Sequence, residues 1–187
     1  MSKITIKKGH MRKIGLFGVT GNPPHLGHLK VVKEAVKSCD EVWVSPVYIH
    51  PFNKKFIDYF HRLAMLNLMF EGLDKVKIVE LDKEFFLKNN KTPYSYDLLK
   101  FIKDENKDVS PLLVIGEDNY KENVWQKFYF HDKIESEFGL IVVKDFGVHS
   151  TQIRSFCHDG NWAMVAQECG QPVAEYLRKN QINYVGD

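Results

Sequence analysis

Short apolar runs and longer amphipathic stretches alternate along most of this chain. Apolar runs bounded by turn residues are typical of strands, and here they fall at residues 13–18, 41–45, 76–80, 112–115 and 140–144. Apolar residues at helical spacing predict helices at residues 26–38, 58–71, 95–103, 150–158, 162–168 and 172–179. The polar residues 82–92 predict a loop or a short helix. We therefore expect an α/β fold: an open parallel sheet of about five strands with helices on both faces.

The stretch at residues 14–29, IGLFGVTGNPPHLGHL, joins the first strand to the first helix through a glycine- and proline-rich turn. His25 and His28 fall on one face of the first helical turn. Helix N-termini bind anions, and Gly27 lets a ligand approach the backbone. Surface residues or a metal pair would also explain two histidines, but ligands of open α/β sheets bind where strand meets helix. The stretch therefore predicts a phosphate site.

Length and composition limit the classes of protein to consider. The chain has 187 residues, 44% hydrophobic and 27% charged, which suits one domain, expected at residues 11–187. Residues 1–10 are interpreted as a leader outside it. The net charge of +2 gives no reason to expect nucleic acid as a partner, and no apolar run has the length of a membrane span. Three cysteines without a CxxC pair fit a reducing cytoplasm.

Two other stretches place cations or a helix start where strands end. Lys54 and Lys55 follow the second strand, on the side of the sheet where ligands bind, although a lysine pair is more commonly a solvated surface feature. Ser150 and Thr151 are good N-caps, and Arg154 lies one turn further along the same helix. Free N–H groups and a guanidinium there would receive an anion. An ordinary capped helix explains the same pattern, so both interpretations stay open on these residues alone.

Several motifs resemble one known family. HLGH resembles the HxGH signature of the nucleotidyltransferase superfamily, and GVTGNPPHLGHL resembles the GGTFDPPHxGHL of bacterial nicotinate mononucleotide adenylyltransferases. STQIR resembles that family's SSTxIR motif, PVYIHPFNKK its PxxxPPHK loop and YFHRLAML its HRLxML helix. PVAEYLRKNQINY resembles the family's C-terminal PxxVxxYIxxxxLY. The resemblance spans the chain from Met11 onward and implies a Rossmann-like fold of the nucleotidyltransferase type.

The resemblance also implies a reaction: adenylyl transfer from ATP to nicotinate mononucleotide, giving deamido-NAD and pyrophosphate, with Mg²⁺ accompanying ATP and no protein metal ligand assigned. It implies that charge is stabilised by His25, His28, Arg154 and either Lys54 or Lys55. The residues expected to bind ATP are Phe17, Gly18, Thr20, Gly27, Gly116, Ser150, Thr151 and Ile153.

The acceptor is expected to contact four residues, namely Asn22, Ser95, Asp118 and Trp125. GED at residues 116–118 resembles the family's GxD element, and residues 92–99 resemble its SYTVDTL segment. Helix capping explains Ser95 and Asp118 nearly as well, and core packing explains Trp125. Arg62 is expected either in pairing on a helix surface or near the substrate.

Three departures from the family pattern leave alternatives open. Gly21 stands where the family usually has Phe, and Asn22 where it usually has Asp, which leaves nicotinamide mononucleotide as an alternative acceptor. Only residues 145–148 separate the fifth strand from His149, so the far edge of the sheet is expected to be trimmed. A phosphopantetheine or cytidylyl acceptor, and a nucleotide binder without catalysis, are further alternatives. A homo-oligomer is compatible with the sequence, whereas an RNA-binding module lacks a supporting basic stripe.

Overall fold

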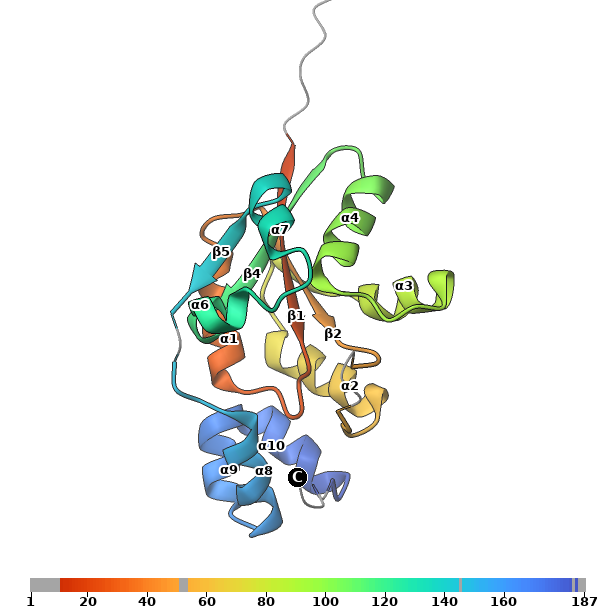
Figure 1. Ribbon diagram of the computed structural model, residues 1–187. Coiled ribbons are helices and arrows are strands. Elements are labelled where there is room, and N and C mark those ends of the chain that lie inside the picture. The colour runs from red at the N-terminus through yellow and green to blue at the C-terminus, as the bar shows by residue number, and fades with distance from the viewer. Residues whose placement is uncertain (1–10, 51–53, 145, 183, 185–187) are drawn as a thin grey trace, which may run out of the picture.

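Five parallel strands form one sheet in the computed structural model, which describes residues 11–50, 54–144, 146–182 and 184 (Figure 1). The strands are β1 (Arg12–Val19), β2 (Glu41–Pro46), β3 (Val76–Ile78), β4 (Val109–Gly116) and β5 (Leu140–Val143). Their order is β3-β2-β1-β4-β5, so the chain changes direction across the sheet between β1 and β4. Open sheets of this kind bind ligands at that switch point. The expected fold class is confirmed. The leader predicted at residues 1–10 lies outside the described residues, as do residues 51–53 of the loop that carries the two lysines.

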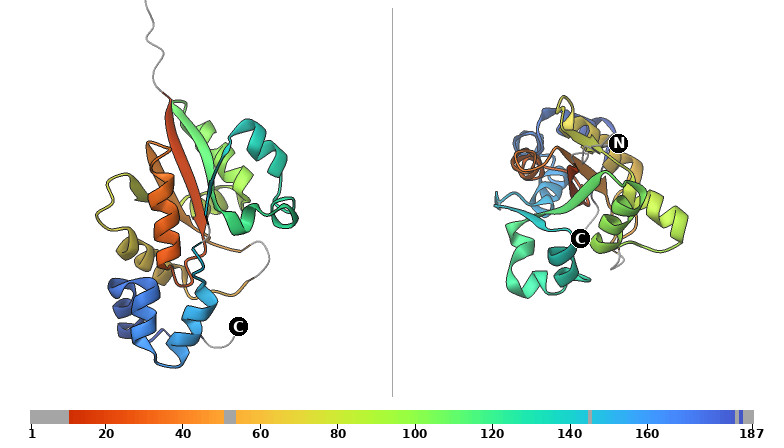
Figure 2. Two further views of the ribbon diagram at one scale, coloured as in Figure 1. Left: turned by 90° about the vertical axis from the view of Figure 1, so that its left-hand side faces the viewer. Right: turned by 90° about the horizontal axis from the view of Figure 1, so that it is seen from above.

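Helices cover both faces of the sheet. In chain order they are α1 (Leu26–Ala35), α2 (Tyr59–Phe70), α3 (Leu81–Asn89), α4 (Ser95–Glu105), α5 (Glu117–Tyr120), α6 (Glu122–Trp125), α7 (His131–Glu137), α8 (Ser150–His158), α9 (Trp162–Cys169) and α10 (Gln171–Lys179). Helices α1 and α2 pack on one face, against Phe17 and Val19 of β1. Helices α3, α4 and α7 pack on the other face, against Ile14 and Leu16 (Figure 2). Because side chains alternate across a strand, the apolar run of β1 supplies both cores, as in a strand buried on both sides.

A third core lies beyond the carboxyl ends of the strands. Helices α8, α9 and α10 pack there around Ile153, Val165 and Leu177, with Met65 contributed by α2 (Figure 1). Val173 and Leu177 of α10 are buried in this core, while Tyr176 is only partly buried and its hydroxyl lies 3.0 Å from Nδ1 of His61. This cluster fixes the start of α8 against the end of the sheet where the site lies.

Two elements differ from the sequence expectation. The polar segment after β3 is α3, a regular helix with acidic residues in its first turn and a left-handed Asn90 at its C-cap. Strand β4 begins at Val109, three residues earlier than predicted, and includes Pro111. A proline is tolerated where its missing N–H faces no partner strand, and β5 pairs with β4 only from Leu113 onward. Pro111 therefore misled the sequence prediction without breaking the strand.

Candidate active site

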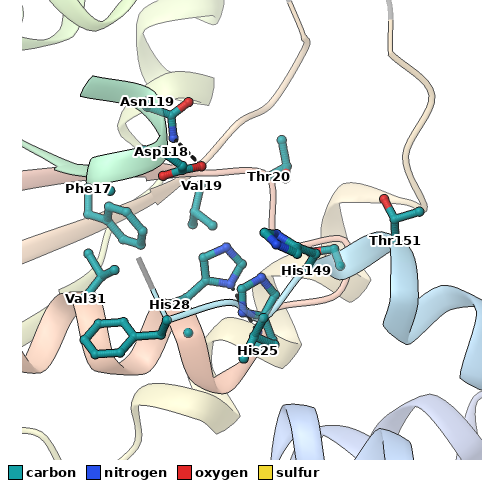
Figure 3. A pocket seen from close by; sticks show the side chains of 16 residues that line it. Phe17, Val19, Thr20, His25, His28, Val31, Asp118, Asn119, His149 and Thr151 are labelled. Atoms are coloured by element: carbon teal, nitrogen blue, oxygen red, sulfur yellow. Dashed lines mark hydrogen bonds between the residues drawn. The ribbon is translucent and has the colours of Figure 1, made fainter. Parts of the chain in front are cut away.

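A cavity of about 370 Å³ lies at the carboxyl ends of β1 and β4. The first turns of α1 and α8 meet it from the opposite side, so N–H groups without partners inside their helices point there. The positive ends of two helix dipoles reinforce the effect, which suits a bound polyphosphate. Its lining, shown in Figure 3, consists of Phe17, Gly18, Val19, Thr20, His25, Gly27, His28, Val31, Gly116, Asp118, Asn119, Phe146, Val148, His149, Ser150 and Thr151.

His25 and His28 lie side by side in this cavity (Figure 3). Their rings stack with centroids 3.7 Å apart, and His25 is the N-cap residue of α1. The backbone N–H of His25 donates to Nδ1 of His28 at 3.1 Å, so the proton of a neutral His28 ring is assigned to Nε2. Burial lowers the pKa of His28 well below its usual value, and the nearby His25 lowers it further. His28 is therefore a neutral N–H donor at physiological pH.

Glycines at two positions make room for polar side chains of the cavity. A Cβ at residue 27 would lie 2.9 Å from Nδ1 of His25, and one at residue 116 would collide with the Asp118 carboxylate. Gly27 was expected to admit a ligand to the backbone, but the His25 ring already occupies the space of its missing side chain. Gly116 in the same way lets Asp118 fold back, where its carboxylate accepts from Nδ2 of Asn119 at 3.2 Å (Figure 3).

The start of α8 is bonded to the turn that follows β1. The Ser150 hydroxyl donates to the carbonyl oxygen of Pro23 at 3.0 Å. The Arg154 guanidinium donates to the carbonyl oxygen of Asn22 at 3.0 Å and to Oγ1 of Thr151 at 3.1 Å. Ser150 and Thr151 line the cavity, whereas Arg154 lies behind Thr151 and outside the lining. Thus the HLGH and STQIR segments, far apart in sequence, meet at one site.

The structure corrects one expectation for α8 and restricts another. Ser150 and Thr151 are not its N-cap, because His149 occupies that position and its side chain makes no capping bond. Ile153 was expected to bind ATP, but it is 0% exposed in the core formed by α8, α9 and α10. The motif therefore divides between residues that face the cavity and one that anchors the helix.

A second cavity, of about 550 Å³, adjoins the first, and the two share Gly18 and Asn119. Its walls combine apolar and aromatic residues with cations, including Lys54 and Lys127. The rings of Tyr94 and Tyr129 lie with centroids 4.9 Å apart on one side. Such a cavity suits a flat ring that carries negative groups. The lining is Gly18, Val47, His50, Lys54, Asp82, Pro93, Tyr94, Ser95, Leu98, Asn119, Val124, Lys127, Phe128 and Tyr129.

The two candidate lysines are separated by the structure. Lys54 lines the second cavity together with His50, and proximity to Lys54 adds to burial in lowering the pKa of His50. Lys55 lines only an adjoining hollow of about 570 Å³ between the β2 loop and the start of α2. Of the pair, Lys54 alone lines the second cavity.

The residues expected to bind the acceptor are not all brought together. Ser95 lines the second cavity, while Asp118 lines only the first. Trp125 lines neither cavity: it is 5% exposed in the core under α7, and its Nε1–H donates to Oε1 of Glu135 at 2.6 Å. The structure therefore favours core packing for Trp125, the alternative that the sequence left open.

Two unusual residues of the turn after β1 have structural explanations. Gly21 has φ of +62°, a conformation in which any side chain is strained, and a Cβ there would touch Leu66. Asn22 is buried and lines neither cavity; its Oδ1 accepts from the backbone N–H of Ile57 at 3.3 Å. Asn22 therefore joins the turn to the loop before α2, and its expected contact with the acceptor stays a prediction.

Arg62 does not lie on a helix surface, as the sequence pattern allowed, but is 2% exposed. It donates to three backbone carbonyl oxygens, those of Thr20 at 2.9 Å, Val47 at 2.7 Å and Ile57 at 3.1 Å. Burial lowers the pKa of its guanidinium. These bonds connect the loops after β1 and β2, so Arg62 acts on the backbone of the site.

Sequence reasoning missed several lining residues. His149 directly precedes STQIR and Asn119 directly follows GED, so extending each motif by one residue would have found them. Asp82, Phe128 and Tyr129 had no such signal, because they come from segments expected to be polar or irregular. Their proximity arises only from the packing of α3, α4 and the segment after α6.

The described residues contain no group of three His, Cys, Asp or Glu side chains that could hold a metal ion. In that part of the chain Asp118 is the one carboxylate that lines the first cavity. The helices found there are also too short or too polar to cross a membrane.

Comparison with known proteins agrees with this geometry. The cytidylyltransferase-like family matches residues 16–156. The nicotinate-nucleotide adenylyltransferase of Bacillus subtilis strain 168 is 32% identical over 145 residues, which cover 74% of this chain and 72% of that protein. A relative from Aliarcobacter butzleri, described as a probable enzyme of the same name, is 26% identical over 147 residues, covering 77% of this chain and 78% of that protein.

Solved structures are similar over most of their length. A Vibrio parahaemolyticus protein, whose crystal structure is described as that of a candidate nicotinate-nucleotide adenylyltransferase, superposes with a TM-score of 0.74 at 26% identity, covering 90% of this chain and 93% of that one. The Plasmodium falciparum nicotinic acid mononucleotide adenylyltransferase complexed with NaAD has the same fold, with a TM-score of 0.74 at 15% identity, covering 91% and 97%. The family match and the similarity to the Bacillus subtilis enzyme show that the chain belongs to the cytidylyltransferase-like family and, within it, to the nicotinate-nucleotide adenylyltransferases.

Proposed function

We propose that this protein transfers the adenylyl group of ATP to nicotinate mononucleotide, giving nicotinate adenine dinucleotide and pyrophosphate. The observation that carries the proposal is the pair of cavities that meet at Gly18 and Asn119. One cavity has the helix starts and paired histidines that suit a polyphosphate, and the other has lysines and aromatic walls. The names of the relatives supply the reaction that joins two such ligands.

In the proposed reaction a phosphate oxygen of the acceptor attacks the α-phosphorus of ATP. A new P–O bond forms as the bond from the α-phosphorus to the bridging oxygen breaks, and pyrophosphate leaves with that electron pair. Catalysis of this kind rests on positioning and on charge stabilisation. The Nε2–H of His28 and the first-turn N–H groups of α1 and α8 are the donors for the oxygens that gain charge. Thr151, which lines the cavity and accepts from Arg154, is the proposed contact for the β- and γ-phosphates.

Mg²⁺ fits this site as an ion carried by ATP rather than by a protein cage. Magnesium sites in phosphoryl-transfer enzymes combine one or two carboxylates with substrate phosphate oxygens. Asp118 is the carboxylate available in the described lining, so it would hold the ion jointly with the phosphates. When bound, the ion neutralises charge on the phosphate oxygens.

The charge of the second cavity favours the acid over the amide as acceptor. Lys54 and Lys127 both line it, and nicotinate mononucleotide carries a carboxylate in addition to its phosphate. Asp82 is the one acidic residue of that described lining, and its Oδ1 accepts from the backbone N–H of Tyr48 at 2.9 Å. Two cations against one engaged carboxylate attract an additional negative group.

The test is pyrophosphate release with ATP and Mg²⁺, using nicotinate or nicotinamide mononucleotide as acceptor at equal concentration. We expect kcat/KM for the acid to exceed that for the amide by at least tenfold. A preference for the amide would move the protein to the other branch of pyridine nucleotide synthesis. Release with neither acceptor, together with ATP binding by calorimetry, would overturn the proposal and favour a nucleotide binder without this activity.

A further inference from the structure

The peptide group between Val47 and Tyr48, just after β2, is hydrogen-bonded on both sides by buried charged residues. The carbonyl oxygen of Val47 accepts from Nη1 of Arg62 at 2.7 Å, and the N–H of Tyr48 donates to Oδ1 of Asp82 at 2.9 Å. These two groups belong to the same planar peptide unit, so a rotation of that plane away from its partners would weaken both bonds together. Arg62 is 2% exposed and Asp82 is 5% exposed. The pair therefore fixes the orientation of this peptide.

The two charges are directed at backbone rather than at each other. Within the described residues Arg62 and Asp82 form no ion pair with any side chain. The backbone N–H of Asp82 donates to the Ser45 hydroxyl at 3.2 Å, which ties α3 to β2. Burying a charge is costly unless it is well hydrogen-bonded, and apolar residues would fill the same space without that cost. Packing alone thus does not account for this arrangement.

The peptide of Val47 and Tyr48 begins the loop that supplies several residues to the second cavity. Val47, His50 and Lys54 all line the second cavity, as does Asp82 itself. On its other side, Nη1 of Arg62 also donates to the carbonyl oxygen of Thr20 at 2.9 Å, and Thr20 lines the first cavity. One guanidinium nitrogen therefore joins the backbones of both cavities.

We propose that Arg62 and Asp82 are positioning residues of the adenylyl transfer, which set the acceptor loop in register with the ATP loop through the peptide of Val47 and Tyr48. The inference rests on the proposed function and deepens it. Asp82 acts on the acceptor side alone, because its carboxylate accepts from the backbone N–H groups of Tyr48 and Ile49. Arg62 acts on both sides, because it holds Thr20 and Val47 together. Burial raises the pKa of Asp82 to about 6, so the residue is mostly ionised at neutral pH.

The first experiment compares KM and kcat for Asp82→Leu, Asp82→Asn and Ile102→Ala. We expect Asp82→Leu to raise the KM for nicotinate mononucleotide at least tenfold while the KM for ATP stays within twofold. Asp82→Asn should recover most of the loss, because its amide oxygen can still accept from Tyr48. Ile102, buried under α4 and outside both cavities, is the control for lost stability. Its truncation should lower Tm without changing either KM.

The second variant, Arg62→Met, should raise both KM values, since it releases Thr20 as well as Val47. A hydrogen-exchange measurement that needs no turnover accompanies the kinetics. Peptides that contain Tyr48 should exchange at least tenfold faster in Asp82→Leu than in the wild type. Their exchange rate should be unchanged in Ile102→Ala. This readout keeps the proposal testable if Arg62→Met fails to fold.

The two proposals fail in distinguishable ways. A wild-type protein without transfer activity, but with the expected exchange pattern, would overturn the proposed function and with it the role of the clamp in transfer. If the wild type is active and the KM for nicotinate mononucleotide is no higher in Asp82→Leu than in the wild type or in Ile102→Ala, the proposed role of Arg62 and Asp82 is overturned while the proposed function stands. An equal rise of that KM in Asp82→Asn and Asp82→Leu would also contradict the role of Asp82, because only the asparagine can still accept the hydrogen bond from Tyr48.

Discussion

The two cavities of this protein are built in different ways. The first is made where regular elements begin and end: β1 and β4 stop there, and α1 and α8 start there. Each of its main polar contributions comes from a short contiguous segment. The second cavity is made mostly of loops and helix sides, from β2 to the residues after α6, and its polar groups are scattered in sequence.

This difference indicates that ATP and the acceptor are recognised in different ways. Phosphate recognition uses backbone N–H groups and helix dipoles, which any chain supplies at a helix start. Recognition of an acceptor needs side chains of particular shape and charge at particular places. The first half is therefore fixed by the fold, and the second depends on devices such as the buried Arg62 that orient loops.

The largest expected effect is on the ATP side, at His28. His28→Ala removes the positioned Nε2–H donor, and we expect kcat to fall by about a hundredfold to a thousandfold, the usual loss for such a donor. Calorimetry should still detect ATP binding, because the helix starts remain. The matched control is His158→Ala, whose exposed imidazole is at the far end of α8 beside Asp159. Equal turnover of the two variants would remove His28 from the mechanism.

The next effect separates the neighbouring lysines on the acceptor side. Lys54→Ala should raise the KM for the acceptor by about tenfold, the scale of one charge-assisted hydrogen bond, without changing the KM for ATP. Lys55→Ala should change the acceptor KM by less than threefold, because Lys55 lines only the adjoining hollow. The measurement is initial-rate pyrophosphate release at saturating ATP. A larger effect at Lys55 would show that the loop is arranged differently during turnover.

A smaller effect distinguishes core aromatic residues from cavity aromatic residues. Trp125→Phe loses the bond to Glu135, so urea unfolding should show a loss of about 1–2 kcal/mol with the acceptor KM within twofold. Tyr129→Ala, whose ring lines the cavity, should raise that KM by about fivefold, the scale of one ring contact, with little loss of stability. The reverse pattern would restore Trp125 as a residue that contacts the acceptor.

The smallest expected effect is the pH dependence of stability that His28 contributes. Its pKa is lowered in the folded protein, so the unfolded chain takes up a proton first as pH falls below about 6.5. The stabilising contribution is thus present above that pH and is lost as pH falls toward the folded pKa. We expect urea unfolding between about pH 7.5 and about pH 5.5 to show a smaller loss in His28→Asn than in the wild type. An unchanged loss would mean that His28 titrates normally.

The same contrast explains what could be predicted from the sequence. The strands, the helix starts and the residues of HLGH and STQIR that line the cavity follow from contiguous patterns with a known period or signature. The burial of the Ile153 side chain was not predicted, because a motif does not say which of its side chains faces the core. For Arg62 the sequence left two positions open, because the partners of a buried guanidinium, three carbonyl oxygens on other loops, leave no trace in helical spacing. Asp82 and Tyr129 reach the site only through tertiary packing.

The central claim is that ATP and the acceptor react across the junction of the two cavities at Gly18 and Asn119. The most direct test is a single turnover with ATP labelled at the α-phosphate, nicotinate mononucleotide and Mg²⁺. We predict that the label appears in the dinucleotide, with one pyrophosphate released for each dinucleotide formed. Label that remains in ATP, or that appears in AMP without dinucleotide, would contradict it.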